Sequence, residues 1–445
     1  MRRLRETLGS WPLHVRAFRL LLAAQITSSL GDYVYAVALP WYVLSGDGGP
    51  VLLSGILASF GVSRVAGIAA GGILADRFGA TRVMLVVDGV RGTAALALGL
   101  IAATSPPSIT VLAVLGAVLG FAGGVFLPAS YVILPSILSE RDLSAGNALS
   151  TMVTQAGGLF GPVLGGAIVA AVSAWPAFLV DAGTFLVSAM VLAMIGRTAP
   201  LPADPPADTA TPAAAGPAGP TFTQVLRHGQ ILRVVLIVGL IGNLVFAGAA
   251  EVALPTLAHD SFGPRGYGSV LTAVALGLIV GALLARWVTV PVRPAYLIFG
   301  LGLLMALSMA TVPFAGGWFG AAVCLFLFST GNGWSSTLLV TMLQIWAPRA
   351  LLGRVMSVVT LAITGVFPLS VMLAGLGVGR LGVAPFFVVA GGAIALGVTV
   401  ALTQPAFRRY RDGDHFALPT PADPTVVPHP ADRNGVETSP IAGRR

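Results

Sequence analysis

The chain has 445 residues, of which 56% are hydrophobic and only 9% are charged. A soluble domain carries about 25% charged residues because its surface faces water, so this composition excludes a soluble protein and predicts a chain that lies mostly in a membrane. The net charge of +8 does not indicate a nucleic-acid partner, because the basic residues stand in short loops and at the termini rather than on one face.

Several kinds of chemistry are excluded by the residue types that the sequence lacks. All 25 basic residues are arginine, and a Walker A loop or a Schiff base needs lysine, so an ATP-driven pump is not expected. Cys324 is the single cysteine, which excludes a disulfide framework and a cysteine-rich metal site. The histidines are scattered over loops and ends and indicate no metal: His14, His228, His259, His415 and His429. No cofactor is expected.

Twelve apolar runs are long enough to cross about 30 Å of hydrocarbon as helices, which takes about 20 residues each. They lie at 18–44, 52–75, 83–103, 109–134, 145–171, 175–195, 231–258, 267–289, 294–313, 317–345, 355–376 and 382–403. The sequence therefore predicts an all-α membrane protein with twelve transmembrane helices.

Polar segments divide these spans into two sets of six. Residues 196–230 contain a stretch rich in Pro, Ala and Thr that cannot form a packed core, so they predict a flexible linker between bundles 18–195 and 231–403. Residues 404–445 predict a disordered tail. No small-residue cleavage site follows the first span, so it is expected to be a retained helix after the N-terminal segment 1–17.

Arginine indicates the orientation, because cytoplasmic loops carry an excess of basic residues. One side holds the arginines of the two termini and of most loops, whereas the other side holds only Arg265 and Arg380. Both termini are therefore predicted to be cytoplasmic, in a multi-pass protein of the cell membrane.

The two sets of spans repeat short motifs in the same order. Residues 37–40 (Val-Ala-Leu-Pro) recur at 252–255, and 143–150 before the fifth span have a counterpart at 351–357 before the eleventh. These repeats predict two pseudo-symmetric six-helix bundles around a central site, an arrangement suited to alternating access.

The loop after the second span holds one carboxylate and two arginines in a glycine-hinged turn, and such a turn can bond to helix ends and to a neighbouring helix. Alone, it would indicate only a basic cytoplasmic loop. Its residues fit the pattern G-x-x-x-D-R-x-G-x-x-[RK]: Gly72, Asp76, Arg77, Gly79 and Arg82. The loop resembles a signature of the major facilitator superfamily, and this resemblance implies a cytoplasmic gate lock in which Asp76 reaches the start of the eleventh span. The second half has Arg286 in place of the aspartate, so any lock is asymmetric.

The fifth span carries glycines at four-residue spacing, which let helices approach closely, and a proline that loosens the backbone hydrogen bonding. Ordinary small-residue packing would give a similar pattern. The residues fit G-x-x-x-G-P-x-x-G-G: Gly157, Gly161, Pro162, Gly165 and Gly166. This resembles the signature of the antiporter branches of the same superfamily, which implies export rather than uptake.

Further residues resemble the branch of that superfamily that holds macrolide-efflux proteins and the enterobactin exporter. They are Gly31 with Asp32, the segment 38–40, Asp88 with Arg91 at the start of the third span, and the segment 179–182. Asp88 and Arg91 are grouped here with the gate motif. The fourth span lacks the intramembrane arginine that many drug–proton antiporters of the family use, so proton coupling by that route is not expected.

Charged residues at membrane depth are costly and are therefore functional candidates. Asp32 and Arg64 both lie about 18 Å below the outer surface, at about 1.5 Å per residue, which predicts an ion pair between the first two spans. Asp181 and Glu251 lie nearer that surface. These four residues are the candidates for proton coupling, and the alternative is that Asp32 and Arg64 only fasten two helices together.

Polar and aromatic side chains on four spans are candidates for a substrate cavity, since a mostly apolar pocket with a few polar groups suits amphiphilic ligands. Packing between helices would explain each of them equally well. They are Tyr33, Tyr35, Gln155, Asn243, Asn332 and Trp334.

The function predicted is that of a monomeric secondary transporter of the major facilitator fold, which exports an amphiphilic drug, natural product or siderophore in exchange for protons. An uptake permease of the same fold is the first alternative. A membrane enzyme acting on lipid would need acids or histidines gathered in an interfacial loop, and none are found. A sensor without transport is the third alternative.

Overall fold

The computed structural model describes residues 12–46, 48–106, 108–139, 141–198, 221–288, 293–348 and 351–410, and all regular secondary structure within them is helical. The first bundle follows a short turn, η1 (Pro12–His14). Its helices are α2 (Arg16–Ser45), α3 (Gly49–Phe78), α4 (Ala80–Thr104), α5 (Ile109–Ile137), α6 (Leu143–Ala171) and α7 (Ala174–Thr198).

The second bundle contains more and shorter helices, because two of its spans are broken. Its elements are α8 (Phe222–His228), α9 (Gln230–Gly248), the π-helix η2 (Ala249–Ala253), α10 (Leu254–Ser261), α11 (Gly263–Trp287), α12 (Pro294–Thr311), η3 (Val312–Phe314), α13 (Trp318–Trp346), α14 (Leu352–Gly365), α15 (Phe367–Leu381), α16 (Val383–Thr403) and α17 (Pro405–Arg409). α9, η2 and α10 form one span, and α14 and α15 form another.

Eleven segments of the described chain are long and apolar enough to cross a membrane. Helix α2, which is 30 residues long and packs along α6 and α7, makes the twelfth long helix. The observed limits differ from the predicted ones by at most five residues, the largest difference being at the end of α15, which was predicted at residue 376 and lies at Leu381. The prediction of twelve spans in an all-α membrane protein is confirmed.

Glycine closes two of the tight turns between spans. Gly79 between α3 and α4 has a φ of 84°, and Gly382 between α15 and α16 has a φ of 86°. This left-handed conformation carries little penalty only for glycine, so each of these two turns can be a single residue long.

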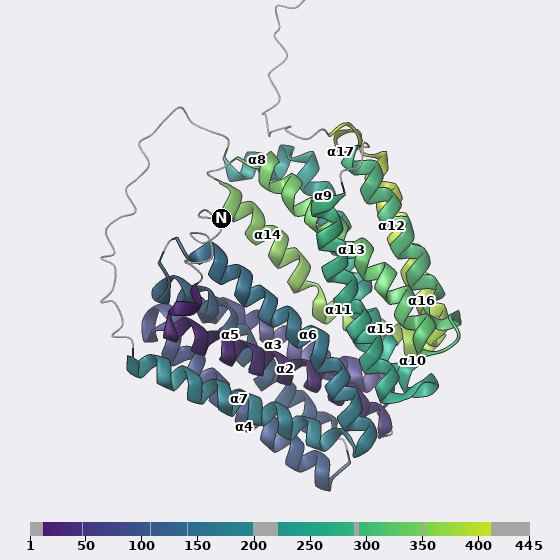
Figure 1. Ribbon diagram of the computed structural model, residues 1–445. Helices are drawn as coiled ribbons and strands as arrows, with labels where there is room; N and C mark the ends of the chain where they lie inside the picture. The colour runs from purple at the N-terminus through teal and green to yellow at the C-terminus, as the bar shows by residue number, and fades with distance from the viewer. Residues whose placement is uncertain are drawn as a thin grey trace, which may run out of the picture.

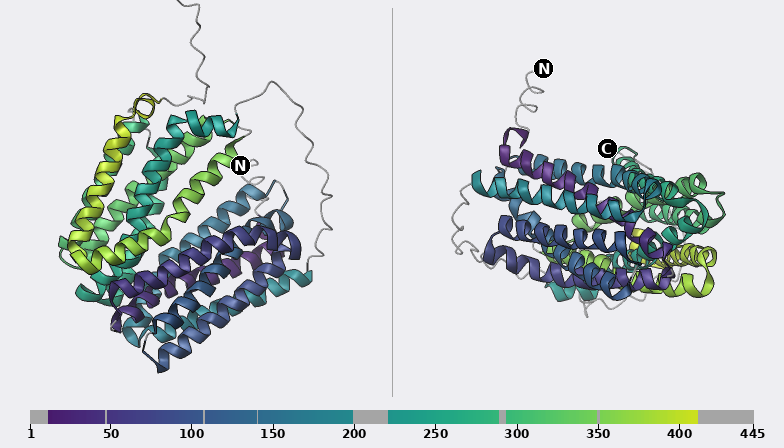
Figure 2. Two further views of the ribbon diagram at one scale, coloured as in Figure 1. Left: turned by 180° about the vertical axis from the view of Figure 1, so that it is seen from behind. Right: turned by 90° about the horizontal axis from the view of Figure 1, so that it is seen from below.

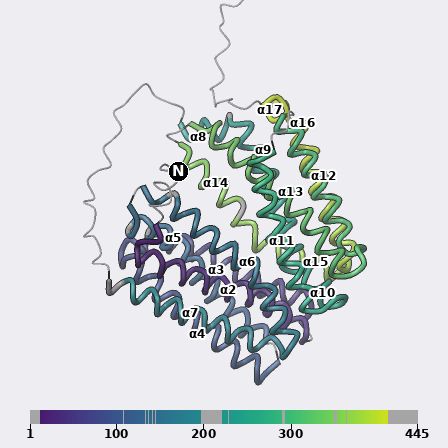
Figure 3. The backbone as a smooth tube through the Cα atoms, viewed as in Figure 1, coloured from purple at the N-terminus to yellow at the C-terminus, as the bar shows by residue number. Residues whose placement is uncertain are grey.

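The two bundles form a wedge (Figures 1 and 2). They diverge on the side where α8 and α17 lie and converge on the opposite side, where α10 lies. Within the first bundle α2 packs along α6 and α7, whereas α3 packs along α5. At the convergent side α6 lies against α11 and α3 lies against α15 (Figure 3).

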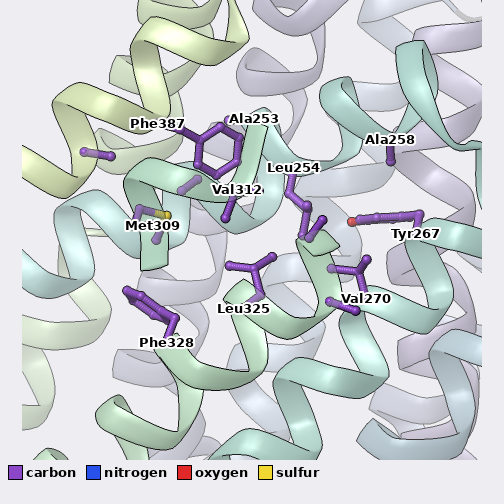
Figure 4. Packing of buried hydrophobic residues seen from close by; sticks show 14 of the residues in the cluster. Ala253, Leu254, Ala258, Tyr267, Val270, Met309, Val312, Leu325, Phe328 and Phe387 are labelled. Atoms are coloured by element: carbon purple, nitrogen blue, oxygen red, sulfur yellow. The ribbon is translucent and has the colours of Figure 1, made fainter. Parts of the chain in front are cut away.

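A large buried cluster lies where the span formed by α9, η2 and α10 crosses its neighbours (Figure 4). Its labelled side chains come from η2, α10, α11, α12, η3, α13 and α16, and they include Leu254, Tyr267 and Phe387. Because lipid tails are as apolar as these side chains, close van der Waals packing rather than escape from water holds such helices together.

Helices lie at the end of the predicted linker 196–230 and at the start of the predicted tail 404–445. Residues 222–228 of the predicted linker form α8, which Thr221 caps by accepting a hydrogen bond from the Gln224 backbone N–H at 3.4 Å. Val225 of this helix is fully buried, and Phe407 of α17, within the predicted tail, is buried too. At this end the predicted linker is helical over 222–228, while residues 199–220 and 411–445 lie outside the described chain.

Candidate transport site

An ion pair inside the first bundle joins α2 to α4. The Arg91 Nη2 group donates a hydrogen bond to Oδ1 of Asp32. The side chain of Arg91 is 12% exposed, but that of Asp32 is 46% exposed. The carboxylate is therefore the accessible member of the pair, and the guanidinium is the buried one.

This pair corrects the expectation that Asp32 binds Arg64. The two residues lie at similar depth, but α2 meets α3 only over a short stretch, because α6 and α7 occupy its main packing faces. Arg91 reaches Asp32 from α4, which packs against α7. The position of a residue along its span carries no information on which face of the bundle that helix presents.

Two further carboxylates surround Arg91. Asp88, one turn earlier on α4, is fully buried and accepts a hydrogen bond from the Ser188 hydroxyl at 2.6 Å. Asp181 on α7 is 2% exposed, and its carboxylate lies where a side chain at Gly31 would otherwise fit. The charge of Arg91 acts on all three aspartates, so this four-residue arrangement is called the Arg91 cluster below.

The Arg91 cluster retains unused bonding capacity. Among the described residues, Oδ1 of Asp88, Oδ1 of Asp181 and Nε of Arg91 are buried without a hydrogen-bond partner. The guanidinium carbon of Arg91 also lies 4.0 Å from the centre of the Phe185 ring, a cation–π contact that holds it in place. Three carboxylates thus lie around one arginine, and the role of Asp32 and Asp181 in proton coupling stays a prediction. Asp88 and Arg91 belong to this cluster rather than to the gate loop.

Arg64 on α3 is linked electrostatically to acidic groups of both bundles. Its charge acts on Asp32 in α2 and also on Glu251 in η2. The guanidinium carbon lies 6.0 Å from the ring centre of Phe60, one turn away on α3. The charge of Arg64 therefore reaches both Asp32 and Glu251, and proton coupling by these residues stays a prediction.

Glu251 sits on a helix defect that a neighbouring hydroxyl maintains. The Ser370 Oγ donates to the Leu244 carbonyl at 2.5 Å and accepts from the Gly248 N–H at 2.7 Å. Ser370 on α15 is thus inserted between two groups four residues apart, which would otherwise bond to each other. Such insertions and π-helical turns break the regular ladder and are frequent at functional sites, and the sequence alone gave no signal for this one.

The glycines of the predicted antiporter motif form two contact faces of α6. Gly157, Gly161 and Gly165 face α2, where a Cβ at Gly161 would lie 2.5 Å from Cβ of Tyr33. Gly166 faces the other bundle, where a Cβ would lie 2.5 Å from the Pro264 carbonyl oxygen.

The same interface between bundles is closed from the α11 side. A Cβ at Gly268 would lie 2.2 Å from the carbonyl oxygen of Pro162, and the Thr272 hydroxyl donates to the Leu159 carbonyl at 2.9 Å. A second crossing brings Gly375 of α15 against Ser54 of α3. The motif therefore fastens α2 to α6 and α6 to α11, at the side where the bundles converge.

The predicted gate loop lies at the divergent side. Gly79 makes the turn, and Asp76, Arg77 and Arg82 are exposed. Asp76 forms no ion pair with any residue that the structure describes. The expected lock between Asp76 and the start of α14 therefore stays a prediction.

Two of the predicted substrate-cavity residues line a real cavity. Asn243 of α9 and Asn332 of α13 border a space of about 160 Å³ in the second bundle. Tyr33 instead packs on Gly158 of α6, and Tyr35 packs with its ring centre 5.8 Å from that of Phe178. Gln155 and Trp334 do not border this cavity.

Comparison with known proteins accords with this architecture. The family model of the Major Facilitator Superfamily matches residues 21–366. The chain belongs to the major facilitator superfamily. It is accordingly a multi-pass membrane transporter of small molecules rather than an enzyme.

Relatives and solved structures of this superfamily agree with the assignment. The chain is 30% identical over 403 residues to the enterobactin exporter EntS of Escherichia coli O1:K1, covering 89% of this chain and 93% of the relative, and 29% identical to EntS of Shigella boydii serotype 4. The POT family transporter PepTSo has a TM-score of 0.68 at 14% identity, covering 90% of this chain and 99% of that one. A bacterial homologue of the iron transporter ferroportin, in an inward-facing state, has a TM-score of 0.64 at 15% identity and covers 87% and 98%.

Proposed function

We propose that this transporter exports amphiphilic small molecules from the cell by proton antiport. The observation that carries the proposal is the Arg91 cluster, in which an accessible Asp32 and two buried aspartates share one arginine. Export is further supported by the filled glycine motif of α6 and by the likeness to enterobactin exporters over 89% of the chain.

The conformation fits the state that receives cargo from inside the cell. The arginine distribution assigns the divergent side, with α8 and α17, to the cytoplasm. The glycine crossings of α6 with α11 and of α3 with α15 then close the outer side. In this state Asp76 is unpaired within the described chain, and we propose that its lock with α14 forms when the inner side closes.

Proton exchange follows from the charge balance of the Arg91 cluster. Arg91 offsets one of the three negative charges, and like charges close together in a poorly solvated site repel one another. Protonation of Asp32 weakens its bond to Arg91 and frees the guanidinium for Asp88 or Asp181. Because Asp32 is the accessible carboxylate, it is the group that exchanges protons with the opening between the bundles, and Arg64 and Glu251 couple this change to the second bundle.

Proteoliposomes test both the direction and the coupling. Two vesicle populations are prepared, in which the protein is inserted in one orientation or in the other. Both are loaded with enterobactin, and a pH gradient is imposed across the membrane. The expected result is enterobactin movement from the cytoplasmic face outwards, matched by proton movement inwards that an internal pH dye records. Movement only toward the cytoplasmic face would identify an uptake permease. Enterobactin movement with no proton movement would refute antiport.

A further inference from the structure

The cavity of the second bundle opens between α9 and α13, with α12 and α16 behind it and Val359 of α14 at its side. Its volume of about 160 Å³ is similar to that of an apolar cavity that holds one benzene ring, about 150 Å³. Phe246 and Phe328 line it as a stacked pair, with ring centres 5.2 Å apart and planes 8° apart. Its dimensions therefore suit one aromatic ring lying against this pair.

The polar groups of this cavity come from only two helices. Asn243 of α9 and Asn332, Ser335 and Ser336 of α13 border it. Among the described residues, the Ser335 hydroxyl is buried and has no hydrogen-bond partner. A buried hydroxyl without a partner costs free energy, so a ligand group that reaches Ser335 would gain the missing bond.

Charge is absent from the same wall. None of the residues bordering the cavity, within the part of the chain described, is Asp, Glu, Arg or His. A charged ligand group would lose its hydration there without an opposite charge to compensate it. In contrast, the charged residues of the candidate transport site lie in the first bundle or, like Glu251, outside this cavity.

We propose that this cavity binds the uncharged aromatic end of the cargo, with amide or hydroxyl groups of that end bonded to Asn243, Asn332 and Ser335. The inference rests on the proposed export function and deepens it. The second bundle then binds the cargo and the first bundle binds the protons. The two binding events are coupled across the interface between the bundles, through Arg64 and Glu251.

Cysteine labelling tests the cavity without any transport. The chain has one native cysteine, so Cys324→Ser provides a cysteine-free background for Ser335→Cys, with Val340→Cys as a second reporter on the same wall. The reagent is N-phenylmaleimide, which carries one uncharged ring. Acetanilide, an uncharged ring with an amide, is expected to slow labelling at least threefold, whereas the matched anion 4-acetamidobenzenesulfonate is expected to have no effect. Ser139→Cys, on an exposed loop, is the reference site that neither compound protects.

A pair of glycine variants connects the cavity to export. Gly242 borders the cavity and Gly392 of α16 does not, and a Cβ at either position meets no atom within 4 Å. Gly242→Leu is expected to slow labelling of the Ser335→Cys reporter and to lower enterobactin export about tenfold, and Gly392→Leu is expected to change neither.

The outcomes separate the two ideas. Equal protection by acetanilide and the sulfonate, or no protection at either reporter, would overturn the proposed cavity ligand. Export by Gly242→Leu at the wild-type rate would overturn the cavity as the cargo site while leaving antiport intact. Selective protection in a protein that exports nothing would overturn the export function and keep the cavity as a binding site.

Discussion

Replacing Asp32 by asparagine should abolish proton coupling while leaving the protein folded. Asp32→Asn keeps the side-chain size and an oxygen acceptor for Arg91, but it removes the charge. A hydrogen bond to a charged group contributes about 1.5–3 kcal/mol, and the 46% exposure of Asp32 places the loss near the lower end. Arg91 also keeps the charges of Asp88 and Asp181 nearby. The expected loss of stability is therefore about 1.5 kcal/mol.

The opposite substitution should be more damaging. Arg91→Gln leaves Asp88 and Asp181 buried without their shared cation, and removing one partner from a buried ion pair costs about 3–5 kcal/mol. Thermal unfolding of the purified protein, followed by tryptophan fluorescence, should rank wild type above Asp32→Asn and Asp32→Asn above Arg91→Gln. In the proteoliposome assay of the proposed function, transport of the enterobactin probe by Asp32→Asn should no longer respond to a pH gradient, although binding of the probe should be retained.

The double variant Asp32→Asn with Arg91→Gln decides between coupling and fastening. If the pair only fastens α2 to α4, the double variant should lose no more stability than Arg91→Gln alone and should recover proton-driven export, because a neutral amide pair replaces the ionic one. That recovery would refute the coupling role of Asp32. If Asp32 carries the proton, export by the double variant should not respond to the pH gradient, whatever its thermal stability.

Three other predictions concern the gates and the helix defect. Asp76→Asn should leave membrane insertion unchanged but slow export about tenfold, because a lock worth about 1.5–3 kcal/mol is lost from the outward-open state; an unchanged export rate would exclude the lock. Gly268→Ala should separate α11 from α6, since its Cβ would lie 2.2 Å from a carbonyl oxygen, and should increase cysteine labelling from the outer side, whereas Gly183→Ala, with no atom within 4 Å, should not. Ser370→Ala should cost about 1–3 kcal/mol and slow export by displacing Glu251, and Ser370→Thr, which keeps the hydroxyl, should restore the rate; equal export by the alanine and threonine variants would exclude a role for the hydroxyl.

The spans were predictable from the sequence because the requirement behind them is local. A helix in lipid satisfies its own backbone and needs only enough apolar residues in a row, so each limit could be read from hydropathy. The sequence also contains the capping signal of α8, as Thr221 is followed three residues later by Gln224, a pattern typical of a helix start.

The partners of the charged residues were not predictable in the same way. Asp32 pairs with Arg91 because α2, α4 and α7 come together in the bundle, and a single sequence does not record how each helix is rotated about its axis. The same reason explains why Asn243 and Asn332 reach the cavity while Tyr35 packs inside the first bundle. The defect at Glu251 depends on a hydroxyl 122 residues away from Gly248.

The glycine crossings between α6 and α11 have an evolutionary consequence. At Gly166 and Gly268 the convergent side is closed by backbone lying on backbone, so the fit depends on the absence of a side chain and not on the identity of any. Substitutions that alter what the protein carries can accumulate on the faces of α9 and α13 without loosening this seal. Neither glycine tolerates substitution, since even a single methyl group at Gly166 or Gly268 would overlap the backbone of the opposite helix.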